Sequence, residues 1–529
     1  MSASLTRRNF LQAAGSLAGT ALAPTLVGCA ASGPSWSKDP FSLGIASGDP
    51  RPDGFVLWTR LAPEPLSADP ATPGGMSGAA APVAFEIAAD PAMRTILRSG
   101  MVLADPDFAW SVHLEITGLA PGRPYWYRFA SGSAQSAIGK TMTAPAADAT
   151  LAKMRFGFVS CANYELGYFS AYRHLAEEQP DLAVFLGDYI YEFVGRRPGV
   201  RKHSDGVTAT DLRTYRNRYA QYRTDPDLQL LHAQVPALMT WDDHEVQNDY
   251  ADDLSETFDD PAKFLLRRAA AYRAFYEHMP VRPSLSRPDG PNMRVFDRFG
   301  FGDLIEFSVL DGRQYRSRQA CYRPPNFGGG HQETNVNCPE RLDPARSMLG
   351  TGQERWLFDG LARSKARWNI IAQDVLMAEM RERQPDGSIG YWTDDWNGYP
   401  ASRERLLRHI HDAKVQNAVV IGGDSHAFWA NELKLDFADP RSPIVATEFV
   451  GTSITSFGPP YDTFMSWMPD NPHIKFFESR RRGYVLVEVT PERLNVAMRV
   501  VSDATDPKAT LATLRSYVVE NGRAGPVEA

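Results

Sequence analysis

The feature that most constrains the fold is an alternation of short apolar segments with amphipathic segments, which begins near residue 153. Six segments have the length and the apolar content of buried strands. They are MRFGFVS (154–160), LAVFLG (182–187), VPALMTW (235–241), LIEFSVL (304–310), WNIIAQ (368–373) and AVVIGG (418–423). Helix candidates lie between them, around residues 168–178, 210–223, 262–278, 353–363 and 402–412. Alternating strands and helices predict an α/β domain with a layered sheet.

The region before this domain has a different pattern. Residues 40–145 contain short alternating segments separated by Gly, Pro and Asp, which predict an all-β unit. The stretch LAPGRPYWYRF (119–129) is similar to the tyrosine-corner region of fibronectin-type and immunoglobulin-like sandwiches. We therefore predict a small β-sandwich over residues 40–145 and the layered domain over 153–510. Residues 511–529 are expected to be a C-terminal tail that either covers the site or frays.

The N-terminus has the pattern of a twin-arginine export signal over residues 1–35. Arg7 and Arg8 precede a weakly apolar run, which Gly, Pro and Thr interrupt too often for a membrane-spanning helix. The run ends in LVGC (26–29), which is similar to a lipoprotein cleavage box. Two outcomes stay open: acylation of Cys29 with tethering to a membrane, or cleavage nearby that releases a periplasmic or secreted protein.

Charge and cysteine content narrow the setting. The net charge of −7 gives no support for a nucleic-acid partner, whose binding face would be basic. Cys321 and Cys338 lie at the two ends of a loop rich in Gly, Pro and Asn. Because exported proteins meet an oxidising compartment, a disulfide between them is expected. Cys161 is then an unpaired thiol that needs another role.

Residues that can bind metals directly follow four of the predicted strands. Cys161 follows the first strand and Asp188 follows the second. The third is followed by DDHE (242–245), and the last by Asp424 and His426. In such sheets ligands bind beyond the carboxyl ends of the strands. Each residue alone is explained as well by a turn or by core packing, but together they predict one shared metal site.

The donor types divide this site into two parts. A thiolate, a phenolate and an imidazole suit a transition metal, and Cys161, Tyr191 and His426 supply them. A phenolate with a thiolate fits ferric iron better than zinc. Carboxylates suit a hard cation, and Asp243 and Asp424 supply them.

Asp188 is placed to bridge the two parts. A site with two metal ions can clamp a phosphate and activate a water or hydroxide for in-line attack.

Five motifs in this order resemble those of the PhoD-like alkaline phosphatases, within the calcineurin-like and purple-acid-phosphatase group. They are SCANYE (160–165), GDYIYE (187–192), TWDDHEV (240–246), LDGRQYR (310–316) and GGDSHAFW (422–429). The resemblance covers residues from about 40 to about 510. It implies a four-layer metallophosphatase sandwich, two β-sheets flanked by helices, preceded by the small β-sandwich. It also implies alkaline phosphatase or phosphodiesterase activity.

The resemblance implies which residues hold the metal ions. Fe³⁺ would be held by Cys161, Asp188, Tyr191 and His426. Ca²⁺ would be held beside it by Asp188 together with two further carboxylates from the chain.

Those two carboxylates are Asp243 and Asp424. The wider group carries Asn where Asp243 stands, so Asn248 is a second candidate for this oxygen donor. The wider group also supplies a His where this chain has Gln373 and Asp374, a departure that favours calcium over a purple-acid type of second metal. A second calcium belongs to the family pattern, and its ligands are not assigned.

The resemblance gives His244 a catalytic role in phosphate contact and protonation of the leaving group. The alternative is that His244 only orients Asp243. Asp242 and Glu245 are expected to support these two residues. Arg313 and Arg316, further along the chain, are candidates for neutralising phosphate or for structural salt bridges.

The sequence thus predicts an exported metal-dependent alkaline phosphatase or phosphodiesterase that uses a metal-activated hydroxide and no covalent protein nucleophile. One alternative is a phospholipase D-like enzyme that acts on phospholipid or polymer diesters. Another, from a different class, is a metal-stabilised surface binding lipoprotein whose β-sandwich is adhesive. The expected partners are a phosphate ester and the twin-arginine export machinery, and the protein is expected to be a monomer.

Overall fold

The computed structural model describes residues 34–195, 199–324 and 328–529. The predicted twin-arginine signal and Cys29 lie almost entirely before residue 34, outside the described residues. None of the helices within these ranges has a run long and apolar enough to cross a membrane.

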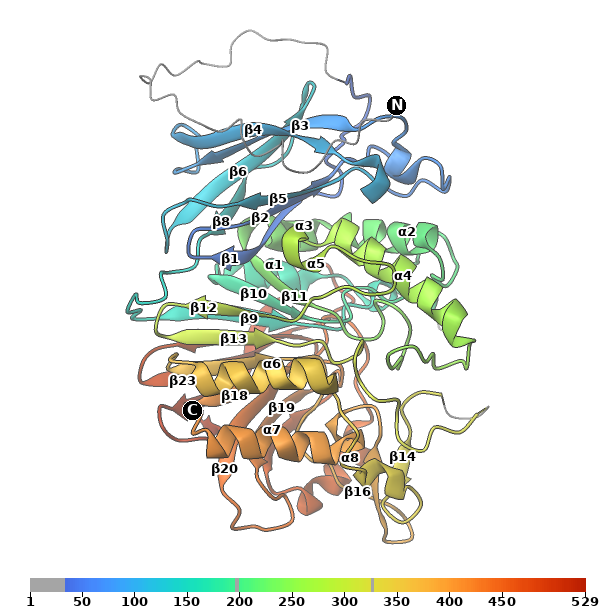
Figure 1. Ribbon diagram of the computed structural model, residues 1–529, viewed down its shortest axis with the longest axis vertical. Helices are drawn as coiled ribbons and strands as arrows, with labels where there is room; N and C mark the ends of the chain where they lie inside the picture. The colour runs from blue at the N-terminus through green and yellow to red at the C-terminus, as the bar shows by residue number, and fades with distance from the viewer. Residues whose placement is uncertain (1–33, 196–198, 325–327) are drawn as a thin grey trace, which may run out of the picture.

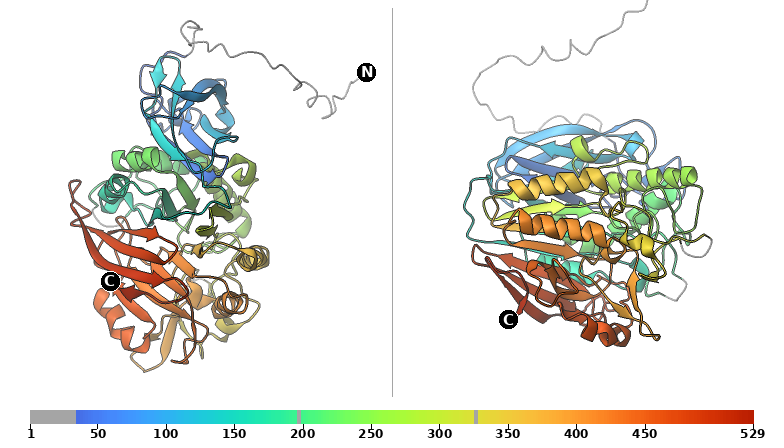
Figure 2. Two further views of the ribbon diagram at one scale, coloured as in Figure 1. Left: turned by 90° about the vertical axis from the view of Figure 1, so that its left-hand side faces the viewer. Right: turned by 60° about the horizontal axis from the view of Figure 1, so that its bottom comes forward.

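Two large β-sheets form the centre of the molecule (Figures 1 and 2). The order of the ten-stranded sheet is β25 (Val527–Glu528), β24 (Leu511–Glu520), β23 (Arg493–Val501), β22 (Gly483–Val489), β9 (Met154–Val159), β10 (Leu182–Leu186), β11 (Ala237–Thr240), β1 (Ile45–Arg51), β2 (Gly54–Arg60) and β5 (Ser111–Ile116). The order of the seven-stranded sheet is β12 (Asp297–Phe301), β13 (Ile305–Val309), β15 (Trp368–Ala372), β18 (Ala418–Gly422), β20 (Ile444–Val450), β19 (Phe428–Lys434) and β21 (Ile474–Glu478). All six predicted strands of the layered domain are present.

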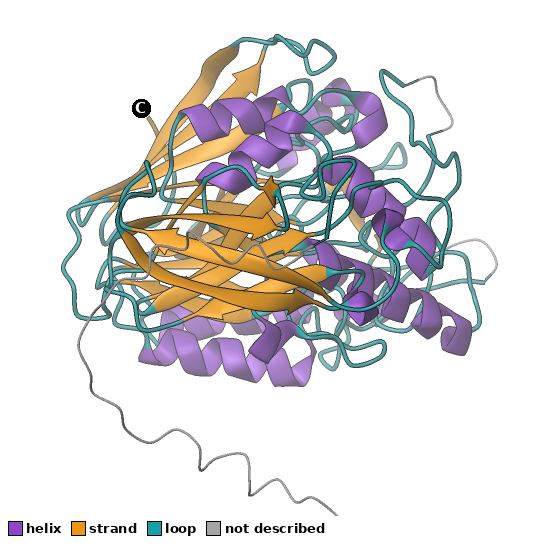
Figure 3. Ribbon diagram, turned by 90° about the horizontal axis from the view of Figure 1, so that it is seen from above, coloured by secondary structure: helices purple, strands orange, loops and turns teal. Residues whose placement is uncertain are grey.

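Helices cover the outer faces of both sheets (Figure 3). The ten-stranded sheet is covered by α1 (Ser170–Glu177), α2 (Leu212–Arg223), α3 (Pro226–Gln234) and α4 (Pro261–His278). The seven-stranded sheet is covered by α6 (Gly350–Arg363) and α7 (Pro400–Asp412). Two short helices, α5 (Pro283–Ser286) and α8 (Tyr461–Trp467), lie in connections. The predicted four-layer sandwich is confirmed.

The apolar runs of the central strands follow from burial on both faces. In β10 all five residues are buried. Ala183 and Phe185 pack against the helices, whereas Val184 and Leu186 pack against the other sheet. Because side chains alternate across a strand, a strand buried on both faces is apolar throughout. The same reason explains why these strands were recognisable as continuous apolar segments.

The N-terminal region shares a sheet with the layered domain. β1 pairs in parallel with β11, and β2 and β5 extend the same sheet. The second sheet of the N-terminal sandwich has the order β4 (Ile96–Ala104), β3 (Ala81–Ala88), β6 (Pro124–Ser131) and β7 (Ala134–Gln135), with β8 (Gly139–Met142) also paired to β6. The Tyr125 hydroxyl donates a hydrogen bond to the carbonyl oxygen of Ala120 at 2.9 Å, which is the contact of a tyrosine corner. The all-β region is therefore a sandwich in which one of the two sheets is the end of the ten-stranded sheet.

The C-terminal residues are part of the same sheet. Residues 511–529, expected as a tail, form β24 and β25 at its edge. In β24, Tyr517 and Val519 are buried, whereas Ser516 and Val518 are half-buried and Glu520 is exposed. The alternation in this segment accounts for its being a strand.

The expected disulfide between Cys321 and Cys338 is present, and Cys161 is a free, buried cysteine. The disulfide lies beside a small sheet of β14 (Gln332–Thr334), β17 (Ile389–Trp392) and β16 (Glu382–Arg383).

Candidate metal centre and active site

The turns that follow the central strands share an unusual backbone conformation. Cys161 follows β9, Asp188 follows β10, and Asp424 and His426 follow β18. Their φ angles are 61°, 53°, 56° and 52° respectively. Residues other than Gly rarely adopt this left-handed region, and such strain is concentrated at functional sites. These four turns direct four candidate metal ligands toward one edge of the sheets.

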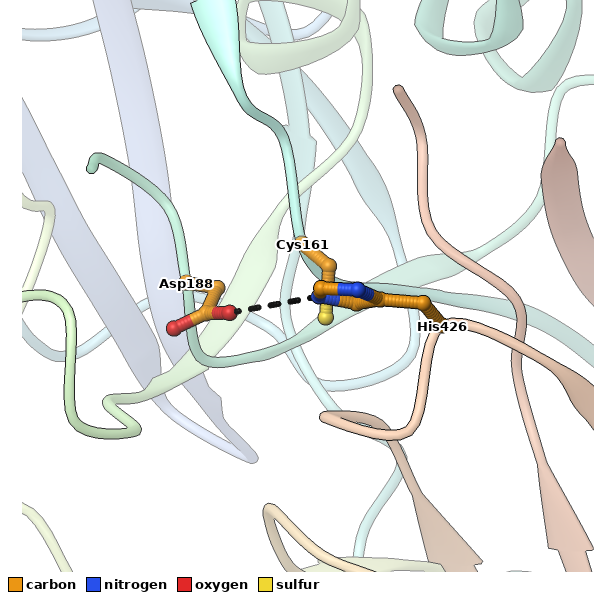
Figure 4. A group of neighbouring side chains, drawn as sticks. All are labelled: Cys161, Asp188 and His426. Atoms are coloured by element: carbon orange, nitrogen blue, oxygen red, sulfur yellow. Dashed lines mark ion pairs between the residues drawn. The ribbon is translucent and has the colours of Figure 1, made fainter. Parts of the chain in front are cut away.

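The first group of candidate ligands combines sulfur, oxygen and nitrogen donors. Donor atoms of Cys161, Asp188 and His426 all lie within 4.8 Å of one another, and the three side chains point toward a common point (Figure 4). The Tyr191 hydroxyl donates to Asp188 Oδ2 at 2.7 Å and lies 3.0 Å from His426 Nε2. His426 Nδ1 lies 2.8 Å from the Phe457 carbonyl oxygen. That contact places the imidazole proton on Nδ1 and leaves Nε2 available to a metal ion.

The second group shares Asp188 with the first. Donor atoms of Asp188, Asp243 and His244 lie within 4.8 Å of one another, and all three side chains are buried. Asp424 is half-buried, and its carboxyl group interacts electrostatically with those of Asp243 and Asp188. Asn248 lies on the wall of an adjoining cavity of about 820 Å³, and its backbone N–H donates to Glu192 at 3.0 Å. The structure thus brings the predicted ligands to one region, with Asn248 at its side.

Negative charge is in excess in this region. Among the described residues, buried oxygen atoms without a hydrogen-bond donor include Asp188 Oδ1, Asp243 Oδ1, Asp242 Oδ2 and both carboxyl oxygens of Asp374. Burial raises the pKa of Asp242 and that of Asp374 above the ordinary value, and neighbouring carboxyl groups raise the pKa of Asp242 further. Buried polar atoms are nearly always satisfied in native proteins. Metal cations would supply the missing partners, so these residues fit a site for cations.

The thiol and the phenol also need a cation to ionise. Burial raises the pKa of Cys161 and that of Tyr191 well above their ordinary values, and the Asp188 carboxylate raises both further. A bound metal ion reverses this effect, because its charge favours the deprotonated ligand. The first group is therefore suited to bind an ion of high charge.

A single carboxylate joins the loops after β10 and β11. Glu245 accepts backbone hydrogen bonds from Asp188 at 3.1 Å, from Tyr189 at 2.5 Å and from Asp242 at 2.9 Å. Glu245 is fully buried. It ties the loop that carries Asp188 to the backbone of Asp242. The sequence predicts a supporting role for Glu245 toward Asp243 and His244, whereas its hydrogen bonds go to Asp188, Tyr189 and Asp242.

His244 lies between the carboxylates and an aromatic face. Its Nδ1 is 2.7 Å from Glu192 Oε2, and its ring centroid lies 4.2 Å from that of Tyr191. Burial opposes a charge on the imidazole, but the Asp243, Glu192 and Asp188 carboxylates outweigh it and raise the pKa of His244 well above its ordinary value. Burial likewise opposes charge on Asp243, yet His244 and Arg313 hold the pKa of Asp243 below its ordinary value.

Comparison with known proteins gives the family. Residues 156–498 match the PhoD-like phosphatase family, and residues 28–145 match the N-terminal domain of PhoD-like phosphatases. The chain belongs to the PhoD-like phosphatase family. It is 44% identical over 532 residues to alkaline phosphatase D of Bacillus subtilis (strain 168), across 98% of this chain and 88% of that protein. A solved structure of PhoD superposes with a TM-score of 0.87 at 44% identity, covering 94% of this chain and 93% of the other. The expected enzyme class, a phosphoesterase, is confirmed.

The two arginines of the LDGRQYR motif are fully enclosed in this PhoD-like phosphatase. Arg313 donates to Asp242 at 2.6 Å and to Asp394 at 2.8 Å. Arg316 donates to Asp394 at 2.6 Å and to the Tyr399 hydroxyl at 3.1 Å. Both arginines therefore form buried ion pairs beneath the site. Of the two roles considered for them, these contacts favour structural salt bridges over neutralisation of phosphate.

Several residues near the candidate metal centre of this PhoD-like phosphatase have no assigned site role in the sequence prediction, in which Gln373 and Asp374 only mark a departure from the wider group. Glu192 contacts His244, and its only signal is its position at the end of GDYIYE. Asp374 is fully buried, and a Cβ at Gly312 would come within 2.2 Å of its Oδ1, so Gly312 leaves room for this carboxyl group. Asp394 lies in a loop without a preceding central strand. Gln373 instead bonds locally to Val375 and to Trp396 and supports the backbone.

Proposed function

We propose that this protein is an exported, metal-dependent phosphoesterase that acts on phosphate monoesters or diesters. Ferric iron would be held by Cys161, Asp188, Tyr191 and His426, and calcium would be held by Asp188, Asp243 and Asp424. The observation that carries the proposal is that Asp188 belongs to both groups of candidate ligands. A carboxylate shared by two groups of different donor type is the arrangement expected for a bridging ligand between a transition metal and a hard cation.

When bound, the two ions supply positive charge for the phosphate and lower the pKa of a water molecule that attacks phosphorus. The residues of the chain position the substrate and move the proton. His244 is the group that protonates the leaving oxygen, because the Glu192 carboxylate, which is not among the proposed metal ligands, bonds to its Nδ1 and favours the charged imidazole. Glu192 accepts from Nδ1 and so fixes the ring with Nε2 available to the substrate. No serine, cysteine or histidine nucleophile is required.

Export through the twin-arginine machinery is part of the proposal and places the protein in the periplasm or outside the cell. The Arg7-Arg8 signal supports it, and so does the Cys321–Cys338 disulfide, which belongs to an oxidising compartment. The arrangement of ligands within an enzyme family also favours a catalyst over a binding lipoprotein. A monomer is proposed, and acylation at Cys29 is the alternative to release.

The test combines metal analysis with activity. Iron and calcium are measured by elemental analysis of the purified chain, and hydrolysis is followed with p-nitrophenyl phosphate and bis-p-nitrophenyl phosphate, with and without a calcium chelator. The Asp188→Asn variant is expected to lose both metals and at least about 100-fold in kcat/KM, since it removes the shared ligand. Asp343→Asn is the matched control, because Asp343 is exposed and an amide oxygen can keep its bond to the backbone of Ala345.

Two results would overturn the proposal. Full activity in Asp188→Asn would exclude this group of residues as the metal centre. A purified, active enzyme that contains zinc and no iron would exclude the assignment of ferric iron to Cys161 and Tyr191.

A further inference from the structure

A second cavity of about 420 Å³ opens directly beside the metal centre. Asp424, a proposed calcium ligand, lies on its wall together with Ser425. The walls are otherwise dominated by aromatic side chains from segments far apart in the sequence, which are Trp392, Trp429, Phe464 and Trp467. A group bound in this cavity would lie next to a phosphate held at the metal centre. The part of a phosphate ester that could occupy this place is one of the alcohol substituents on its phosphate.

The aromatic cavity also contains two acidic side chains, Glu382 and Asp395. Within the described ranges neither forms an ion pair. Arg403 is near enough to Asp395 to lower its pKa, but its ion pair is with Glu379 at 3.0 Å, and Arg383 pairs with Asp470. Glu382 accepts from the Gln332 amide, and Asp395 accepts from the backbone and side chain of Asn397.

The two carboxyl groups are held in an unfavourable environment. Burial raises the pKa of Glu382 to about 7. Burial also raises the pKa of Asp395 to about 8, and the nearby Glu382 raises it further. A cation in the cavity would offset both effects. The aromatic walls decide which cation fits, because they offer ring faces where a metal ion would need several oxygen ligands.

Ring faces with nearby carboxylates are the recognition chemistry of organic ammonium groups. The negative face of an aromatic ring attracts an alkylammonium ion, and a trimethylammonium group presents both charge and apolar surface to it. Trp392 is 39% exposed, so one wall of the cavity is accessible from solvent. A hydrated anion has no comparable partner among these side chains.

We infer that this cavity binds an alkylammonium group carried by one alcohol substituent of the phosphate ester. The inference rests on the proposed function and names the substrate class of the same site. Asp424 links the two, because it lies both in the cavity wall and among the proposed calcium ligands. The substrate is then a choline-like or ethanolamine-like phosphodiester, either soluble or as the headgroup of a lipid.

The test compares two reporter substrates of the same shape, p-nitrophenyl phosphocholine and p-nitrophenyl 3,3-dimethylbutyl phosphate. The second replaces the charged nitrogen by carbon. The wild-type enzyme is expected to prefer the charged substrate by roughly tenfold in kcat/KM. The ratio of kcat/KM for the charged reporter to kcat/KM for the uncharged one should fall toward one in Glu382→Gln and in Trp392→Leu. Glu404→Gln is the matched control, since Glu404 is exposed on α7 and pairs with Arg408.

Trp392→Leu keeps the test valid if Glu382→Gln does not fold, because Trp392 is partly exposed on the short strand β17. A calorimetric titration with choline and with 3,3-dimethylbutanol gives a readout that is independent of turnover. Glycerophosphocholine and phosphatidylcholine micelles then separate a soluble substrate from a lipid one.

The outcomes distinguish this inference from the proposed function. Hydrolysis of both reporters at equal rates, or faster hydrolysis of the uncharged one, overturns the inference and leaves the phosphoesterase intact. A preference that persists in both cavity variants also overturns it. If neither reporter nor p-nitrophenyl phosphate is hydrolysed, the proposed function fails. The titration then tests the cavity without turnover: choline binding supports the inference, and equal or no binding of choline and 3,3-dimethylbutanol overturns it.

Discussion

Glu245 offers the sharpest test of how the loops hold the metal centre. Its carboxylate is the common acceptor for backbone N–H groups of Asp188, Tyr189 and Asp242, which belong to two different loops. Glu245→Gln changes the shape very little but replaces one acceptor oxygen by an NH₂ donor. If the amide oxygen takes the place of Oε2, which serves Asp188 and Asp242, the NH₂ group faces the N–H of Tyr189.

The magnitude follows from counting these bonds. A hydrogen bond to a charged acceptor contributes about 1.5–3 kcal/mol, and a buried donor left without an acceptor costs about 1–3 kcal/mol. Losing the Tyr189 bond and weakening the two others should therefore destabilise the protein by about 3 kcal/mol. Because Asp188 is then free to move, metal content and kcat/KM should fall by about 10–100-fold, as for other residues that support metal ligands.

The assay is metal content, kcat/KM and thermal unfolding at about pH 9. Burial raises the pKa of Glu245 to about 8, so this higher pH keeps the Glu245 carboxyl group mostly ionised. The control is Glu448→Gln. Glu448 is also fully buried and accepts backbone N–H groups of Met377 and Ala378 at 2.6 and 2.9 Å, but its carboxylate bonds to neither loop of the metal centre. It should lose stability and keep its metals.

Metal content and kcat/KM within twofold of wild type in Glu245→Gln would refute the reasoning. So would an equal loss of metal in both variants, since that would show general destabilisation instead of a local effect on Asp188.

Two further predictions concern stability. His113 Nε2 lies 2.7 Å from the Tyr276 carbonyl oxygen and 3.0 Å from that of Met279, and burial lowers its pKa from 6.5 to about 4. The stability that neutral His113 contributes is fully present above pH 6.5 and is lost as pH falls toward 4, by up to about 3 kcal/mol. His113→Asn should therefore weaken the dependence of Tm on pH between pH 4 and 6.5. An unchanged dependence of Tm on pH would contradict this prediction. Replacing Cys321 and Cys338 by Ser opens a loop with a sequence separation of 17 and should cost about 3 kcal/mol. Scanning calorimetry would show a lower Tm for this double variant, and an unchanged Tm would contradict the prediction.

The central strands and the residues after them could be predicted because their signal is local. A strand buried on both faces is apolar throughout, and its end is marked where polar residues begin, as at Leu186 before Asp188. The pairing of β1 with β11 could not be predicted in the same way. Which strands pair side by side in a sheet depends on contacts between distant segments. Strands from both sides of the boundary expected between residues 145 and 153 therefore belong to one ten-stranded sheet.

The roles of residues whose partners lie far away in the chain also could not be predicted from the sequence. Asp394 is defined by its bonds to Arg313 and Arg316, which lie about eighty residues earlier. The aromatic cavity brings Trp392, Trp429 and Trp467 together from three separate segments. Each is an ordinary apolar residue in its own segment, and only the packing of β17, β19 and α8 makes them neighbours.

Charge balance gives the proposed ions a role in stability as well as in catalysis. Asp188, Asp243 and Asp424 lie near one another in a region where Arg313 is already paired with Asp242 and Asp394. Burying carboxylates without counter-charges would cost far more than the stability of a typical domain. Protonation would relieve this cost, but it would also remove the ligands. The proposed ferric iron and calcium would together bring five positive charges, which would match these three carboxylates, the Cys161 thiolate and the Tyr191 phenolate. On this proposal, bound cations would neutralise the charges that the strained turns bring to one edge of the sheets.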